Sequence, residues 1–115
     1  MRLKSDMVVS ALVRRVFNAG DYAAVLRKGA ADAGAIFIRQ RNRLGIETLY
    51  APAPQSFFDE GEAAGRLFER RLTSDGSEEI DALIAREARF DPDCWVVEIE
   101  VEEIGDLFEI SPPES

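Results

Sequence analysis

The chain has 115 residues, with 46% apolar and 31% charged side chains and a net charge of −8, which is typical of one folded domain with a hydrophobic core. The absence of histidine excludes Ser-His-Asp and Cys-His catalysis and most zinc sites, and a single cysteine cannot form a disulfide within the chain. No apolar run reaches the roughly 20 residues that span a bilayer, so we expect a cytoplasmic protein outside the membrane.

The first half of the chain predicts a helix followed by three strands. Apolar side chains recur at helical spacing over residues 9–16, which predicts a helix capped by Ser5 or Asp6 and ended by Gly20. Gly34 indicates a bulge or a close approach of another backbone segment. The short turns between the strands favour an antiparallel meander, and the strands are predicted at residues 22–28, 33–41 and 44–51.

Proline and glycine interrupt the pattern after the third strand. Pro52 and Pro54 fix an extended segment that is excluded from the centre of a ladder. A fourth strand is predicted at residues 66–72, and its charges favour either an edge position or an extended segment packed by Leu67, Phe68 and Leu72. A second helix is predicted from a cap at Ser77 to the residue before Pro92, with acidic side chains in its first turn, where the helix dipole favours them.

A last strand is predicted at residues 94–101. Trp95, Val97 and Ile99 alternate with positions that include glutamates, so this strand has one face in the core and one in solvent. Beyond Gly105 the side chains that can still pack are Leu107, Phe108 and Ile110.

Together these elements predict an α+β fold, a two-layer sandwich with a mostly antiparallel sheet of about five strands and both helices on one face. We expect a single domain over residues 1–110 and a flexible tail over residues 111–115.

Four stretches of the sequence resemble, in their order and spacing, the short alphaproteobacterial proteins grouped as domain of unknown function 1491. The Pro-Ala-Pro-Gln-Ser and Arg-Phe-Asp-Pro-Asp blocks are the most specific. The resemblance implies a compact cytoplasmic single-domain protein of bacterial type, and it carries over no activity and no catalytic residue. The four stretches are Met1–Ser5, Asp32–Ile38, Ala51–Ser56 and Arg89–Glu100.

Charge is unevenly distributed. Residues 1–50 carry nine basic and four acidic side chains, whereas the rest of the chain carries five basic and eighteen acidic ones. Arg39, Arg41 and Arg43 are predicted on one face of the second strand, where they form a candidate strip for nucleic-acid phosphates. The alternative is cross-strand pairing with Glu47 and the acidic half. Because the net charge is negative and lysine is scarce, we do not expect a nucleic acid as the main partner.

The carboxylates of the last strand offer only weak candidate sites. Asp93 and Glu98 follow the spacing of metal-dependent nucleases, but Glu100 stands where those enzymes have lysine. The wider acidic surface can hold a divalent cation weakly, although such runs are usually solvated. We therefore predict no catalytic residue, no metal site and no cofactor. Acidic neighbours are expected to raise the pKa of Cys94 and make it a poor nucleophile.

The best candidate for a binding site is the proline segment together with the corner before the last strand. A rigid extended segment on a scaffold is where binding sites gather, and an amide and a hydroxyl beside it offer donors and acceptors. The alternative is a purely structural role. With the two arginines of the strip, the candidate ligand- or partner-binding residues are Pro52, Pro54, Gln55, Ser56, Arg89, Asp91, Arg39 and Arg41.

Three hypotheses follow for function. The first is a non-enzymatic protein-binding or accessory module that acts through an unknown protein partner or by self-association, with the fourth strand as its exposed edge. The second is a small carboxylate- and arginine-based enzyme or ligand-binding domain around Arg89, Asp91 and Gln55, which requires a pocket where these groups converge. The third is weak nucleic-acid binding through the arginine strip.

Overall fold

One six-stranded sheet organises the molecule, with strand order β1-β5-β2-β3-β4-β6. The computed structural model describes residues 3–54 and 66–111. No helix in these two ranges is both long and apolar enough to cross a bilayer. The elements are α1 (Ser5–Asn18), β1 (Tyr22–Arg27), β2 (Ile36–Arg41), β3 (Glu47–Pro52), β4 (Leu67–Ser74), α2 (Glu78–Phe90), β5 (Trp95–Glu100) and β6 (Glu109–Ile110).

The predicted α+β class is confirmed, but the predicted meander of the first three strands is wrong. β5 lies between β1 and β2, antiparallel to the first and parallel to the second. β6 runs parallel to β4, so the sheet is mixed. The physical reason is that β5 has apolar side chains at three successive positions, 95–97, which suits a central strand with both faces covered.

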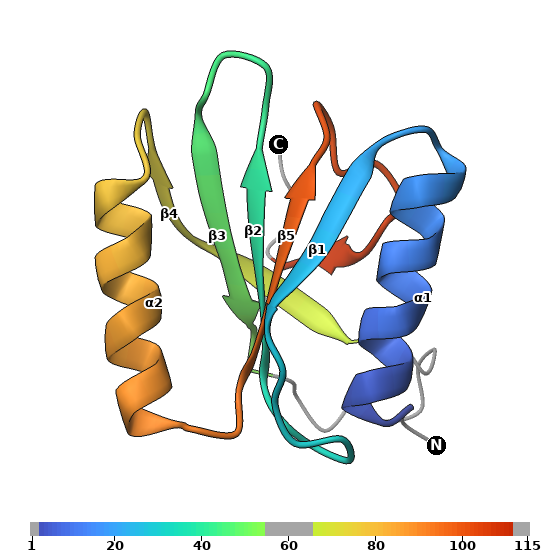
Figure 1. Ribbon diagram of the computed structural model, residues 1–115, viewed down its shortest axis with the longest axis vertical. Coiled ribbons are helices and arrows are strands. Elements are labelled where there is room, and N and C mark those ends of the chain that lie inside the picture. The colour runs from blue at the N-terminus through green and yellow to red at the C-terminus, as the bar shows by residue number, and fades with distance from the viewer. Residues whose placement is uncertain (1–2, 55–65, 112–115) are drawn as a thin grey trace.

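The two helices lie on opposite faces of the sheet, as Figure 1 shows with the sheet between them, so the predicted two-layer arrangement with both helices on one face is wrong. On one face Val9, Leu12 and Val16 of α1 pack with Trp95, Val97 and Ile99. On the other face Ile80 of α2 packs with Phe37, Leu49 and Val96. Each helix has its own apolar stripe, and neither stripe specifies which face of a sheet it will cover.

Trp95 lies in the core as predicted, with 4% of its surface exposed. The predicted solvent face of β5 is wrong at Val96, which is buried in the core on the α2 side. The indole Nε1 of Trp95 donates a hydrogen bond to the carbonyl oxygen of Ala30 over 2.8 Å. Gly34 also fulfils its prediction, because a Cβ at this position would overlap the carbonyl oxygen of Asp93. A Cβ at Gly29 would meet the same oxygen. The β1–β2 connection is therefore packed directly against the corner that precedes β5.

The N-termini of the two helices are not capped in the way the sequence predicts. Neither helix has a side-chain cap hydrogen bond. Ser5 is buried inside the first turn of α1, where its Oγ donates to the carbonyl oxygen of Gly34 over 2.6 Å. Ser77 precedes α2 in a helical conformation, with φ −94° and ψ −14°. The hydroxyl of Ser5 thus joins α1 to the β1–β2 connection.

β4 pairs with β3 along its length, whereas β6 pairs only with Leu67 and Phe68, so the rest of β4 lies at an edge of the sheet among the described residues. The predicted packing of Leu107, Phe108 and Ile110 is confirmed, since all three are partly buried against the α1-side core. Ser111 donates its backbone N–H to the carbonyl oxygen of Phe68 over 2.7 Å. The remaining residues of the expected tail, 112–115, lie outside the described part of the chain.

Candidate functional site

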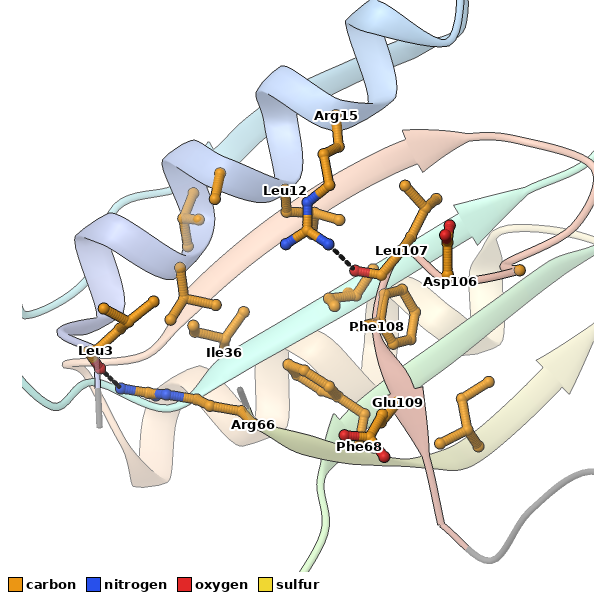
Figure 2. Close-up of a pocket in the computed structure, with 16 residues that line it drawn as sticks. Leu3, Leu12, Arg15, Ile36, Arg66, Phe68, Asp106, Leu107, Phe108 and Glu109 are labelled. Carbon is orange, nitrogen blue, oxygen red and sulfur yellow. Dashed lines mark hydrogen bonds between the residues drawn. The ribbon is translucent and has the colours of Figure 1, made fainter. Parts of the chain in front are cut away.

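An apolar groove of about 510 Å³ lies between α1 and the segment that leads to β6. Its size falls in the range of small-molecule sites in proteins, roughly 300–1,000 Å³. Figure 2 shows its floor on β2 and its walls on α1, β4 and the C-terminal segment. The apolar side chains that line it are Leu3, Val8, Val9, Ala11, Leu12, Ile36, Ile38, Phe68, Leu107, Phe108 and Ile110.

The C-terminal wall of the groove is held in place by aromatic contacts. Gly105 has a φ of +54°, a conformation that favours glycine, and the chain after it turns back along the sheet. Phe108 makes edge contacts with Tyr50 and Phe68, with ring centroids 5.2 Å and 5.1 Å apart. These contacts fix Phe108 at the groove without filling it.

Two arginines stand at the ends of the groove, as Figure 2 shows. Arg15 extends from α1, and its Nη1 donates to the carbonyl oxygen of Leu107 over 3.3 Å. Arg66 donates from Nη2 to the carbonyl oxygen of Leu3 over 3.1 Å. Arg15 forms no ion pair with any residue that the structure describes. The guanidinium of Arg15 therefore keeps donors for an anion at the mouth of an apolar groove.

This groove is not among the sites predicted from the sequence, although the residue spacing of α1 indicates one of its walls. Val8, Ala11, Leu12 and Arg15 follow the i, i+3, i+4, i+7 spacing of one helix face. The apolar stripe of residues 9–16 alone predicts that Arg15 faces solvent. Arg66 and the C-terminal wall reach the groove through strand pairing over long sequence distances, which no local pattern predicts.

The arginine strip is mostly neutralised. Arg39 is buried, and it donates from Nε to Oε1 of Glu47 over 2.6 Å and from Nη1 to Oδ1 of Asp81 over 2.7 Å. Arg41 donates from Nε to Oε2 of Glu47 over 3.1 Å and lies 3.8 Å from a carboxylate oxygen of Glu100. Burial lowers the pKa of Arg39, but its hydrogen bonds to Glu47 and Asp81 and the charges of those carboxylates outweigh burial and raise the pKa overall. Arg39 and Arg41 thus form the pairing with Glu47 and the acidic half that was the alternative. The predicted place of Arg43 on the same strand face is wrong, because β2 ends at Arg41 and Arg43 lies in the turn that follows.

The proline segment and the corner lie at the same end of the sheet, because β3 ends where β2 and β5 begin. Pro52 is the exposed last residue of β3, and Pro54 is also exposed. Asp91 follows α2, and its carboxylate accepts the backbone N–H of Asp93 over 3.1 Å. Arg89 is exposed and makes no ion pair with Asp91.

No hydrogen bond in the described ranges joins the proline segment to the corner, and neither of them lines the groove. Gln55 and Ser56 lie outside the described residues. Residues 52 and 53 do line a smaller pocket of about 200 Å³ near Arg66. A binding role for the proline segment and the corner stays a prediction.

Cys94 is buried beside the corner. Burial raises the pKa of its thiol, and the charge of Asp91 raises it further, whereas Arg27 opposes the shift. The direction of the shift agrees with the prediction, but its cause is burial, because Arg27 lowers the pKa more than Asp91 raises it. Within residues 3–54 and 66–111 no three His, Cys, Asp or Glu side chains lie close enough to hold a metal ion together.

Comparison with known proteins identifies the family. The model of the family described as "Protein of unknown function (DUF1491)" matches residues 3–109. The solution structure of protein Atu0922 from A. tumefaciens is 59% identical, with 100% of each chain covered and a TM-score of 0.86. No curated protein matches the chain.

Two structures from Caulobacter crescentus CB15 are also similar, and both are described as DUF1491 family proteins. The crystal structure is 34% identical over 95% of this chain and 99% of the other, with a TM-score of 0.78. The NMR structure is 35% identical over 100% of this chain and 99% of the other, with a TM-score of 0.77. The chain therefore belongs to the DUF1491 family.

Proposed function

We propose that this protein is a non-enzymatic binding module whose groove takes a small amphipathic anion, with the apolar body against α1 and β2 and the acidic head group at Arg15. The observation that supports it most concerns Arg15. This arginine lies at the mouth of the apolar groove, and it has no ion-pair partner among the described residues. Apolar walls with a few polar groups are the usual composition of a small-molecule site. The ligand class is therefore a carboxylate with an aliphatic or aromatic body.

The groove suits binding better than it suits catalysis. Its floor and walls are aliphatic and aromatic, and Asp106 and Glu109 are the carboxylates that line it. Both are exposed, so they lack the burial that would prepare an acid or a base for proton transfer. The groove supplies contact area and a charge, which are sufficient for recognition.

Two of the hypotheses from the sequence receive less support. Nucleic-acid binding would need free cations, whereas Arg39 and Arg41 are held by Glu47, Asp81 and Glu100. A carboxylate- and arginine-based enzyme at the corner would need convergent groups, and Arg89 and Asp91 are not paired. Protein binding stays a candidate at a different surface, described below.

A titration followed by two-dimensional ¹H–¹⁵N NMR tests the proposal, with decanoate as the probe and its concentration kept below micelle formation. Ala11 is half-buried in the groove wall, so Ala11→Phe fills the site from within. Ala85→Phe is the matched control, because Ala85 is exposed on α2 on the other side of the sheet.

We expect decanoate to shift the amide signals of α1 and of residues 105–110 in the wild type and in Ala85→Phe. In Ala11→Phe the same amide signals should not shift. Shifts that are absent, that map away from the groove, or that persist in Ala11→Phe would refute the proposed site.

A further inference from the structure

The sheet is open at one edge, the outer side of β1. Among the described residues the only strand that pairs with Tyr22–Arg27 is β5, and no loop or cap hydrogen bond involves its backbone. The outer row of N–H and C=O groups is thus available to another strand. At the opposite edge β6 and Ser111 cover only Leu67 and Phe68, and the rest of β4 pairs with β3 alone among the described residues. That stretch carries Arg70 and Arg71, and charged side chains discourage edge pairing.

The features that protect an edge strand are confined to the end of β1, where the bulge at Leu26 and the charged Arg27 and Lys28 lie. Proteins blunt such edges with lysine, proline or inward charges, whereas residues 22–26 are Tyr-Ala-Ala-Val-Leu. Tyr22, Val25 and Leu26 are 48%, 45% and 50% exposed. Phe17, also half exposed, makes an edge contact with Tyr22 at 6.1 Å between ring centroids. An uncharged apolar strip therefore runs along the open edge.

The charges at the two ends of β1 are complementary under a two-fold rotation. Asp21 precedes the strand, and Arg27 and Lys28 end it. When two copies of β1 pair antiparallel, the acidic end of each lies beside the basic end of the other. Lys28 is exposed and has no ion pair among the described residues, so it is available for Asp21 of a second copy. A bulge at Leu26 limits the regular pairing to the stretch before it.

We propose that β1 is a self-association edge, at which a second copy of this chain adds its own β1 antiparallel and joins the two sheets into one. Backbone hydrogen bonds supply the attraction, and the two Asp21–Lys28 pairs select the antiparallel direction. This proposal is independent of the groove, because none of the residues 21–28 lines it. Self-association is thus proposed at β1, whereas the sequence favoured β4 as the exposed edge.

Sedimentation velocity over a dilution series tests this interface, with circular dichroism to confirm that each variant is folded. We expect the wild type to shift from monomer toward dimer as its concentration rises. Leu26→Lys places a charge on the edge and should weaken the dimer about tenfold, whereas Leu44→Lys is the matched control at the β2–β3 turn and should not change it.

A charge exchange tests the direction of pairing. Asp21→Lys and Lys28→Asp should each weaken the dimer about tenfold, because each creates two like-charge pairs. The double variant Asp21→Lys/Lys28→Asp should return to within about twofold of the wild type. A wild type that stays monomeric at every concentration would overturn the proposal. Dimerisation that is equally strong in Leu26→Lys, or that is not restored in the double variant, would also overturn it.

Discussion

Arg39 and Glu47 form a buried ion pair between β2 and β3, with Nε of the arginine 2.6 Å from Oε1 of the glutamate. Their side chains are 9% and 3% exposed. Asp81 extends the pair to α2, because its Oδ1 lies 2.7 Å from Nη1 of Arg39. This connection fixes the position of α2 over β2 and β3.

Glu47→Gln should destabilise the protein by about 3 kcal/mol, because removing one partner leaves a buried guanidinium incompletely compensated. Asp81→Asn should cost about 1 kcal/mol or less, since the Asp81 side chain is 60% exposed and its pair is screened. Urea denaturation gives both values. Glu103→Gln, at an exposed position, is the control and should stay within about 0.5 kcal/mol of the wild type. Equal stabilities for Glu47→Gln and Glu103→Gln would contradict the structure.

Gly34→Ala should destabilise the protein by about 2–3 kcal/mol, because the added Cβ overlaps the carbonyl oxygen of Asp93 and forces two backbone segments apart. The same change at Gly76, which has no atom within 4 Å of the added Cβ and no positive φ, should be nearly neutral. Thermal unfolding of the two variants measures the difference. A Gly34→Ala protein as stable as Gly76→Ala would show that the β1–β2 connection is not packed on the corner.

Cys94 should react with iodoacetamide far more slowly in the folded protein than in denaturant, because the thiol is buried and its pKa is raised. A raised pKa means that the folded state binds the thiol proton more tightly than the unfolded chain does. This contribution to stability is complete below the ordinary cysteine value, about 8.5, and is lost as pH rises from there through the folded pKa. Cys94→Ser should reduce that loss, which urea unfolding at several alkaline pH values measures. Rapid labelling of the native protein at neutral pH would contradict the prediction.

The sequence predicts the elements of this fold better than their arrangement. Both helices and β1 to β5 lie close to where periodicity predicts them, and Trp95 is buried as its alternation with glutamate indicates. Periodicity is a local property, and it holds no information about which strands pair. The insertion of β5 between β1 and β2 depends on contacts across more than 50 residues, such as Ala23 with Ile99.

The same limit applies to the candidate site. Glu47 was correctly weighed as a partner for the arginines, since an acid opposite a base on neighbouring strands is a short-range relationship. Arg15 was missed, because its role depends on Leu107 and Phe108, which reach α1 only after the chain has crossed the sheet.

The affinity of decanoate for Arg15→Gln, compared with Arg14→Gln, tests the proposed function most directly. Arg14 is an exposed neighbour on α1 that does not line the groove, so it matches the change in charge without touching the site. Titration calorimetry should show binding about fivefold weaker for Arg15→Gln and within about twofold of the wild type for Arg14→Gln. Equal affinities for the two variants, or no binding by the wild type, would contradict recognition of an anion at this groove.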